Sequence, residues 1–219
     1  AIAIAFAAAG ARVVVAGRTA ATLDGTLAAL PSGCAKALAL TADVADSASV
    51  RAMFARIERE FGRLDILVNN AGIGIEDIGR FNQTVAARGK ELSSGEPLRT
   101  QWNVTQEMPD EEWRRMLAVH LDGTFYCTRE ALQLMSRTHR GVVINVASTA
   151  GLAGQEGAPH YSAAKAGMLG FTRAVAREVA TQNIRVNALC PGFVDTAMSE
   201  GYSPAFKRGT LSRIPLGRW

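Results

Sequence analysis

A tyrosine and a lysine four residues apart are the strongest sign of chemistry in this 219-residue chain. Only small residues separate Tyr161 from Lys165, and a spacing of four places both side chains on one face of a helix. A neighbouring ammonium favours the phenolate and lowers the pKa of a phenol. The pair is therefore a candidate acid and base that works nearer neutral pH than the ordinary tyrosine pKa of about 10.

A third candidate group comes from the segment that precedes this helix. Ser148 ends the apolar run "VVINVAS", and the last residues of parallel strands face the ligand crevice of an α/β sheet. The Ser148 hydroxyl can bind a carbonyl or alcohol oxygen while Tyr161 exchanges a proton with it, and Lys165 can also bind a ribose hydroxyl. An incidental exposed Tyr–Lys pair is the alternative, but a strand-end serine thirteen residues upstream favours chemistry.

Apolar segments of two kinds alternate along the chain, as is typical of a parallel sheet with helices between its strands. The expected strands are 12–17, 35–44, 64–72, 141–148 and 184–192. The expected helices are 1–9, 20–30, 47–62, 110–138 and 161–181, with Ser47 or Ser49 as the N-cap of the third. The sequence thus predicts one α/β domain with a parallel sheet over residues 1–219.

A polar connection, residues 76–108, interrupts this alternation between a strand and its following helix. Connections of this length are uncommon in compact domains and are often functional or mobile. A short helix is expected around 81–90. Because the connection leaves the carboxyl end of its strand, Phe81 or Trp102 can line a substrate site; a surface elaboration without a catalytic role is the alternative. Its basic residues either meet an acidic carrier protein or are ordinary surface charge: Arg80, Arg88 and Lys90.

Composition and charge argue against several other classes of protein. Hydrophobic residues make up 48% and charged residues 20%, an ordinary balance for a globular protein. The net charge of +4 is scattered rather than gathered in a patch, so no nucleic-acid partner is expected. The three cysteines and three histidines lack the spacing of a disulfide framework or a metal site. No apolar run reaches the ~18 residues of a membrane span, and we expect a cytoplasmic protein.

Four segments, in family order, resemble the classical short-chain dehydrogenase/reductase family: "NNAG" (69–72), "NVAS" (145–148), "YSAAK" (161–165) and "NALCPGFVDT" (187–196). The start of the chain resembles the family's first helix and second strand, and the resemblance spans nearly everything except the polar connection. It implies a doubly wound, Rossmann-like α/β fold. The likeness implies an oxidoreductase that interconverts a secondary alcohol and a ketone with a nicotinamide cofactor. In general character the chain is similar to 3-oxoacyl-carrier-protein reductases, so an acyl thioester is also a candidate substrate.

The resemblance also implies roles for individual residues. Tyr161 would be the acid and base, Ser148 would orient the substrate, and Lys165 would bind ribose and lower the pKa of Tyr161. The other implied cofactor contacts are Asp43 and Val44 at the adenine, Asn70, Ala71 and Gly72 along the cofactor, and Val194 and Thr196 at the nicotinamide. Members commonly form homo-dimers or homo-tetramers through two long helices, here 110–138 and 161–181. A non-catalytic dinucleotide-binding or regulatory protein on the same scaffold is the competing interpretation.

Two positions suggest features particular to this chain. His120 occupies a position where the family usually carries asparagine behind the lysine; its ring either continues a proton relay or is a buried structural histidine. At the end of the strand 12–17, Gly17 stands where NAD enzymes carry an acid, and Arg18 follows it. A guanidinium suits an adenosine 2′-phosphate, which favours NADP(H) over NAD(H), unless Arg18 merely stacks on the adenine.

The resemblance places further segments outside this sequence. The family's glycine-rich phosphate turn and its preceding strand would come before Ala1, and an edge strand would come after residue 219. We therefore expect a fragment, truncated at both ends, of a longer protein and only part of a Rossmann-type domain. The first strand would lie between 12–17 and 64–72, in the middle of the sheet. Without its phosphate-binding turn the chain is expected to bind a dinucleotide poorly.

Overall fold

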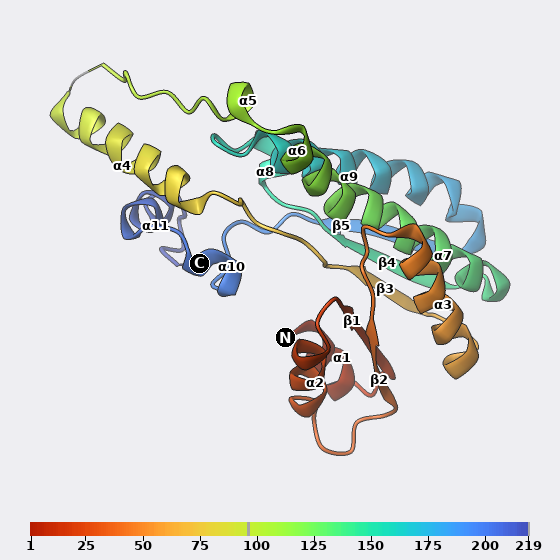
Figure 1. Cartoon of the computed structure of the whole chain (residues 1–219). Helices are drawn as coiled ribbons and strands as arrows, with labels where there is room; N and C mark the ends of the chain where they lie inside the picture. The colour runs from red at the N-terminus through yellow and green to blue at the C-terminus, as the bar shows by residue number, and fades with distance from the viewer. Residues whose placement is uncertain (96, 219) are drawn as a thin grey trace.

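A computed structural model describes residues 1–95 and 97–218 of the chain, which fold into two parallel sheets flanked by helices (Figure 1). One sheet has two strands and the other has three, in the order β3-β4-β5. The strands are β1 (Val13–Gly17), β2 (Ala37–Thr41), β3 (Ile66–Asn69), β4 (Gly141–Val146) and β5 (Ile184–Leu189). All five expected strands are present, although each is shorter than its apolar run.

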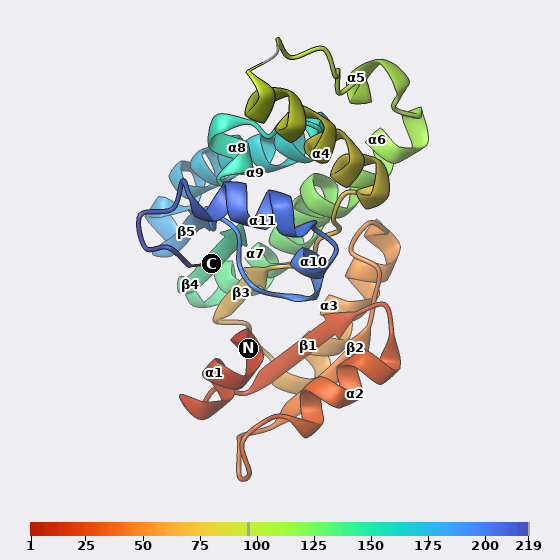
Figure 2. The same cartoon turned by 90° about the vertical axis from the view of Figure 1, so that its left-hand side faces the viewer.

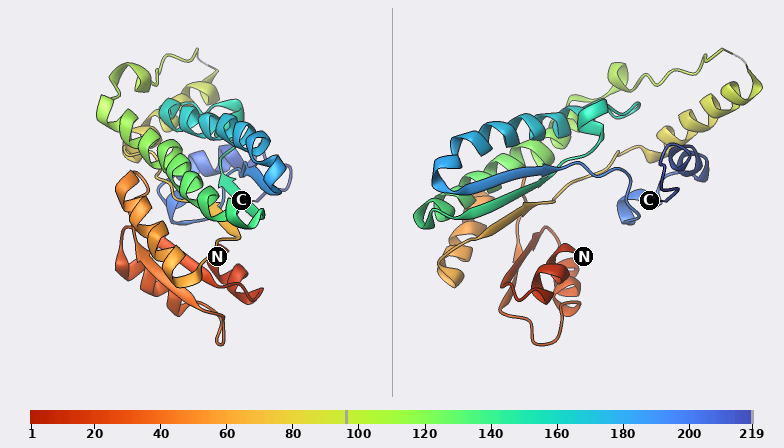
Figure 3. Two further views of the ribbon diagram at one scale, coloured as in Figure 1. Left: turned by 90° about the vertical axis from the view of Figure 1, so that its right-hand side faces the viewer. Right: turned by 180° about the vertical axis from the view of Figure 1, so that it is seen from behind.

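Helices alternate with the strands. They are α1 (Ile2–Ala8), α2 (Ala20–Ala28), α3 (Ser47–Phe61), α4 (Ile78–Ser94), α5 (Val104–Glu107), α6 (Asp110–Leu117), α7 (Gly123–Thr138), α8 (Ala150–Ala153), α9 (Pro159–Glu178), α10 (Ala197–Glu200) and α11 (Pro204–Leu211). Helices α1 and α2 lie beside the two-stranded sheet (Figure 2). Helices α7 and α9 run along one face of the three-stranded sheet, and α3 packs against α7 (Figure 3).

The main hydrophobic core lies between α3, α7, α9 and the three-stranded sheet. Val143 of β4 and Val186 of β5 are buried in it together with Phe54 of α3. Half-buried Val14 and Leu40, from the two-stranded sheet, pack against the same core. The two sheets therefore share one core even though they are not hydrogen-bonded to each other.

The start of α3 differs from the prediction. Its N-cap is Asp46, whose Oδ1 accepts the Ala48 N–H at 2.8 Å, and neither Ser47 nor Ser49 has this role. Ser47 lies inside the helix, and the Ser49 hydroxyl instead accepts the Asp43 N–H at 3.0 Å. A carboxylate is as good an N-cap as a serine, so composition alone does not choose among three neighbouring candidates.

The helix expected over 110–138 contains a π-helical turn. The π-turn η1 (Ala118–Asp122) separates α6 from α7, and His120 lies at its middle. Widening the turn changes the hydrogen-bond register, and the Thr124 Oγ1 donates to the His120 carbonyl at 2.6 Å. Turns of this kind occur frequently at functional sites, and the apolar periodicity of the sequence carries no sign of them.

The polar connection is more ordered than the sequence suggests. Helix α4 covers 78–94, longer than the expected 81–90, and Asp77 caps it by accepting the Arg80 N–H at 2.8 Å. The helix ends at Gly95, whose φ of 74° lies in the left-handed region that favours glycine. Figure 1 shows α4 beside α11, so this connection lies next to the C-terminal helices.

The expected break in the sheet is present between the strands at 13–17 and 66–69. Within the described residues, β1 pairs with β2 and β3 pairs with β4, and no ladder joins β1 to β3. Nowhere in residues 1–95 or 97–218 does a helix combine the length and apolar character needed to cross a membrane.

Candidate active site

The carboxyl end of β4 positions Ser148. The Ala147 N–H donates to the Leu189 carbonyl at 2.8 Å, and the Thr149 N–H donates to the Pro191 carbonyl at 3.0 Å. These bonds join the residues around Ser148 to the end of β5. The Ser148 Oγ accepts the Ala150 N–H at 3.1 Å at the start of α8, so the serine leaves the sheet at its carboxyl edge.

Helix α9 brings Tyr161 and Lys165 to the same place. Pro159 starts this helix, which places Tyr161 in its first turn and Lys165 in the next. Helix α8 packs against α9 at Gly151, where a Cβ would lie 2.7 Å from the Lys165 carbonyl carbon. This close approach of two backbones brings the Ser148 hydroxyl near enough to the Tyr161 phenol to lower its pKa through a hydrogen bond.

Lys165 is 4% exposed, and its ammonium lies beside the phenol ring. Its Nζ donates to the Val146 carbonyl at 2.7 Å and lies 5.6 Å from the centre of the Tyr161 ring. That bond uses one of the three donors of the ammonium. Burial lowers the pKa of Lys165 to about 8.

The electrostatics of Tyr161 differ from the expectation. Burial raises the pKa of the phenol, and the hydrogen bond from Ser148 opposes this rise only in part. Lys165 was expected to lower the pKa of Tyr161, but here its ammonium faces the ring and a backbone carbonyl. Because desolvation outweighs the hydrogen bond, the phenol is protonated at neutral pH.

His120 contacts this cluster from the π-turn. Its Nε2 lies 3.1 Å from the Ile73 backbone nitrogen and 3.0 Å from the Ile73 carbonyl oxygen. Its ring meets the Tyr161 ring edge to face at 5.3 Å between centroids. Burial, with Lys165 as the next cause, lowers the pKa of His120 to about 4. Its buried Nδ1 has no hydrogen-bond partner among the described residues.

A buried ladder of polar side chains supports the site, and the sequence reasoning missed it. The Asn69 Nδ2 donates to the Asn145 Oδ1 at 2.8 Å and to the Thr128 Oγ1 at 3.0 Å. The Asn145 Nδ2 donates to the Thr172 Oγ1 at 2.8 Å. The ladder connects β3, β4, α7 and α9, the elements that present the cluster. Asparagines inside two buried strands were the available signal, because buried amides need partners.

The residues expected to contact a cofactor follow the carboxyl ends of β1, β2, β3 and β5. These residues lie in the segments that follow those strands: Arg18, Asp43, Val44, Asn70, Ala71, Gly72, Val194 and Thr196. Gly72 lies against His120, since a Cβ there would be 2.6 Å from the His120 Cε1. Arg18 follows β1 of the two-stranded sheet and is exposed.

The Asp43 carboxylate accepts a hydrogen bond from the backbone of its own turn. Its Oδ1 accepts the Ala45 N–H at 2.9 Å, which shapes the segment after β2. Val44 lies against the start of α7, where a Cβ on Gly123 would come within 3.0 Å of the Val44 Cγ2. Thr196 has a second role as N-cap of α10, in a reciprocal capping box with Ser199.

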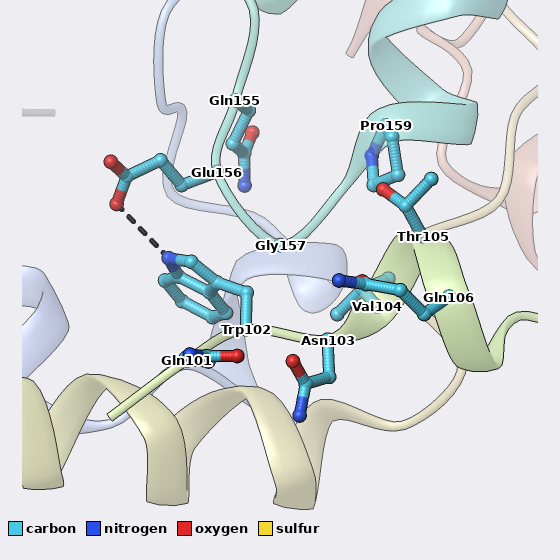
Figure 4. A pocket seen from close by; sticks show the side chains of 10 residues that line it. All are labelled: Gln101, Trp102, Asn103, Val104, Thr105, Gln106, Gln155, Glu156, Gly157 and Pro159. Carbon is cyan, nitrogen blue, oxygen red and sulfur yellow. Dashed lines mark hydrogen bonds between the residues drawn. The ribbon is translucent and has the colours of Figure 1, made fainter. Parts of the chain in front are cut away.

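A cavity of about 350 Å³ lies between the polar connection and the loop before α9 (Figure 4). The Trp102 indole lies against that loop, and its Nε1 donates to the Glu156 Oε2 at 3.1 Å. Gln155 and Pro159 also line the cavity, whereas Tyr161 is not among its lining residues. The connection and the loop that precedes α9 therefore share this cavity.

Comparisons with known proteins identify the family of this chain. A family model described as short chain dehydrogenase matches residues 1–205. A "3-oxoacyl-[acyl-carrier-protein] reductase FabG" of Escherichia coli is 34% identical over 218 residues, which cover 100% of this chain and 78% of the relative. The same-named protein of Staphylococcus aureus is 35% identical over 181 residues, or 83% of this chain. That alignment spans 63% of the Staphylococcus protein, less than two thirds of its length.

A solved structure resembles the whole chain. The crystal structure of a putative short-chain alcohol dehydrogenase from Sinorhizobium meliloti superposes with a TM-score of 0.83 at 32% identity. The match covers 100% of this chain and 77% of that protein.

Proposed function

Because the chain belongs to the short-chain dehydrogenase family, we propose that it interconverts a secondary alcohol and a ketone with a nicotinamide cofactor. The observation that carries this proposal is the convergence of Ser148, Tyr161 and Lys165 where β4 ends and α9 begins. A hydroxyl, a phenol and an ammonium at one edge of the sheet can together bind a single substrate oxygen and exchange a proton with it.

Each of these groups has a distinct part in the proposed reaction. Ser148 donates a hydrogen bond to the substrate oxygen, and Tyr161 exchanges a proton with the same oxygen. The raised pKa of Tyr161 keeps the phenol protonated, which suits proton donation during ketone reduction. A bound nicotinamide supplies or accepts the hydride. His120 is neutral at physiological pH, so its ring acts on the cluster as a hydrogen-bonding group rather than as a charge.

The residues present suit the two ends of a dinucleotide. The buried Lys165 ammonium retains donors for ribose hydroxyls after its bond to Val146. The exposed guanidinium of Arg18 suits a 2′-phosphate, and the strand before it ends in glycine rather than an acid. Both features support NADP(H) rather than NAD(H) as the cofactor. Asn70, Ala71 and Val194 complete the proposed contacts.

The substrate and the assembly are proposed by analogy with the relatives. Two of these are named as reductases of 3-oxoacyl-carrier-protein, which supports an acyl thioester or a small ketone as the substrate. Phe125 of α7 is 43% exposed and meets Phe171 of α9 at 6.3 Å, which supports a homo-oligomer through these two helices. A cytoplasmic location stays a prediction.

A non-catalytic dinucleotide-binding protein is the competing function, and Tyr161→Phe distinguishes the two. Loss of the phenolic proton should lower kcat for NADPH-dependent ketone reduction by about 10²- to 10⁴-fold. The Kd for NADPH, measured by fluorescence titration, should stay within about threefold because the ring remains. Tyr126→Phe, the same change in α7, is the matched control and should keep wild-type kcat. Wild-type protein that binds NADPH but reduces no ketone would favour the competing function.

A further inference from the structure

The first turn of α9, which carries Tyr161, begins without a side-chain cap. Its N-cap residue is Ala158, and a methyl group cannot accept a hydrogen bond from the backbone. Pro159 follows and has no N–H, so the turn closes with the bond from the Ser162 N–H to the Ala158 carbonyl at 3.0 Å. Uncapped helix ends fray because their terminal backbone groups lack partners. Contacts with other elements therefore matter for the position of Tyr161.

Two side chains of this turn contact neighbouring parts of the chain. The Ser162 Oγ accepts the Gln155 N–H at 2.9 Å, which joins the turn to the loop before it. His160 is fully buried, and its Nε2 lies 3.3 Å from the Glu112 Oε1 of α6. Helices α6 and α9 pack against each other (Figure 1). The residue next to Tyr161 is thus in contact with another helix.

The His160 ring is neutral at physiological pH. Burial lowers its pKa, and the carboxylates of Glu112 and Glu76 oppose this fall. A neutral imidazole has one N–H, and the tautomer with that proton on Nε2 directs the donor at Glu112. Within the described residues neither ring nitrogen has a partner of standard hydrogen-bond geometry. The Glu112 carboxylate is therefore the polar group that lies nearest to hand for the buried ring.

Glu112 differs from the two acids that precede it. Three consecutive acids begin α6, and acids in a first turn are favourable because of the helix dipole, whatever they face. Asp110 and Glu111 pair with Arg114, and their side chains are 75% and 83% exposed. The Glu112 side chain is only 23% exposed and faces His160. Its place in the fold thus goes beyond the general preference for an acid at this end of a helix.

The segment from α6 to the π-turn η1 contacts α9 at two successive residues. At the start of α6, Glu112 lies against His160. At the other end of the segment, the His120 ring of η1 meets the Tyr161 ring at 5.3 Å between centroids. The position of this segment therefore affects both the backbone that carries Tyr161 and the ring itself.

We infer that Glu112 is a positioning residue of the proposed reaction, which holds His160 and so fixes the turn that presents Tyr161 to Ser148. This inference rests on the proposed function and adds a residue outside the segments that resemble the family. Glu112 acts through His160 rather than on the substrate. The contact needs an acceptor oxygen rather than a negative charge, because the neutral imidazole offers a single N–H.

Amide hydrogen exchange tests whether Glu112 holds the first turn of α9. In Glu112→Ala the Ser162 N–H should exchange at least about tenfold faster, because the turn opens more often. Glu112→Gln keeps an acceptor oxygen for the His160 N–H, so its exchange rate should stay within about threefold of the wild type. Glu111→Ala removes the adjacent, exposed acid and is the matched control, with an unchanged rate expected at Ser162.

Turnover of the same variants tests the positioning role. With NADPH and ethyl 3-oxobutanoate as the probe ketone, Glu112→Ala should lower kcat about 10- to 100-fold, because a displacement of about 1 Å at a catalytic group has an effect of this size. Its Kd for NADPH should change less than about twofold. Glu112→Gln should keep kcat within about threefold of the wild type. A residue that only stabilised the fold would lower the thermal midpoint without this separation of kcat from Kd.

A double-mutant cycle shows whether Glu112 acts through His160. The amide of asparagine reaches about as far as the Nδ1 of the ring, so His160→Asn keeps a polar side chain and loses the contact. It should lower kcat about as much as Glu112→Ala does. Because the two residues act as one unit, the double variant should lose less than about threefold more than either single variant. If His160→Asn does not fold, the alanine and glutamine variants of Glu112 decide the question.

Several results would overturn the role of Glu112. These are an unchanged kcat or an unchanged Ser162 exchange rate in Glu112→Ala, equal losses in Glu112→Gln and Glu112→Ala, or losses that multiply in the double variant. The proposed function fails separately. If Ser162 exchange responds as expected but the wild type does not reduce the keto ester, the contact with His160 stands and the oxidoreductase proposal falls. If the wild type reduces the keto ester and Glu112→Ala does so equally well, the oxidoreductase proposal stands and the positioning role falls.

Discussion

At neutral pH the His120 ring carries no charge, because burial and then the neighbouring Lys165 lower its pKa to about 4. An imidazole in this state has one donor and one acceptor nitrogen, as a carboxamide has a donor and an acceptor. The contact of Nε2 with the Ile73 backbone uses one of these two hydrogen-bonding nitrogens. The buried Nδ1 has no hydrogen-bond partner among the described residues.

The free energy of unfolding should record this buried neutral histidine. The unfolded chain takes up a proton on His120 below pH 6.5, whereas the folded chain does so only near pH 4, so acid favours unfolding. Between pH 7 and pH 5 the wild type should lose about 2 kcal/mol relative to His120→Asn. Urea unfolding of both proteins at each pH measures the difference, and the contribution of His160 is common to both. A difference independent of pH would contradict the lowered pKa.

The proposed preference for NADP(H) over NAD(H) depends on one side chain, the guanidinium of Arg18. Arg18→Asp removes the proposed partner of the 2′-phosphate and places an acid where a free 2′-hydroxyl can be bound. The kcat/KM for NADPH should fall by about 10- to 100-fold while that for NADH rises or stays unchanged. Arg12→Asp, ahead of the same strand at its other end, is the matched control and should not alter the ratio. An unaltered ratio in Arg18→Asp would remove the assignment.

Residues that act within a local motif could be predicted, and residues that act through distant partners could not. The Tyr161–Lys165 pair follows from helical spacing, and Ser148 follows from its place at a strand end. The Asn145–Thr172 bond joins side chains 27 residues apart, so no local pattern indicates it. The rise in the pKa of Tyr161 likewise depends on burial by elements that pack only in the folded chain.

At the scale of elements, strands were predicted more securely than helix boundaries and turns. Apolar runs locate β3, β4 and β5, although β5 is buried on one face only, with Ile184 and Val186 buried and Arg185 and Asn187 exposed. The π-turn at 118–122 escaped prediction because one widened turn leaves the apolar face of the flanking helices nearly unchanged. Helix α4 was underestimated because its polar face is long and one buried aromatic residue, Phe81, anchors it.

Helices α8 and α9 approach each other so closely at Gly151 that no side chain fits between them. Gly151→Ala would place a Cβ 2.7 Å from the Lys165 carbonyl carbon and 2.8 Å from its oxygen, so the helices must separate. We expect a loss of about 1–3 kcal/mol in the free energy of unfolding. The kcat/KM should fall about 10- to 100-fold, because Ser148 moves relative to Tyr161.

Another helical glycine distinguishes this contact from a general effect of glycine in helices. Gly89 of α4 has no atom within 4 Å of an added Cβ. Gly89→Ala should therefore raise the free energy of unfolding by up to about 1 kcal/mol and leave kcat/KM unchanged. Denaturant unfolding and steady-state kinetics on both variants check the comparison. If Gly151→Ala behaves like Gly89→Ala, the contact does not position the site.

At the scale of the whole molecule, one core spans two sheets whose facing strands are not hydrogen-bonded to each other. The order of motifs predicted this arrangement, since the family resemblance places one further strand between those at 12–17 and 64–72, and no ladder joins β1 to β3 among the described residues. The partnership of the connection with α10 and α11 was not predictable, because it rests on Asn82, Phe81 and Tyr202, which no sequence motif links. Long-range packing of this kind becomes visible only in three dimensions.

Strands β1 and β3 are not hydrogen-bonded to each other, so each has an edge that a further strand could pair with. Joining to Ala1 a parallel strand and a glycine-rich turn of the family type should let that strand pair with both β1 and β3. Paired backbone groups replace open strand edges, so the free energy of unfolding should rise by several kcal/mol. The turn should tighten NADPH binding at least about tenfold, because its backbone N–H groups face the pyrophosphate.

The same extension with the glycines of the turn replaced by alanine is the matched control for this prediction. It should retain the added stability and lose the added affinity, because the strand still pairs while the backbone can no longer approach the phosphates. Calorimetric titration with NADPH and denaturant unfolding measure the two effects separately. NADPH affinity equal in the extended and unextended chains would show that the residues present already supply the whole binding site.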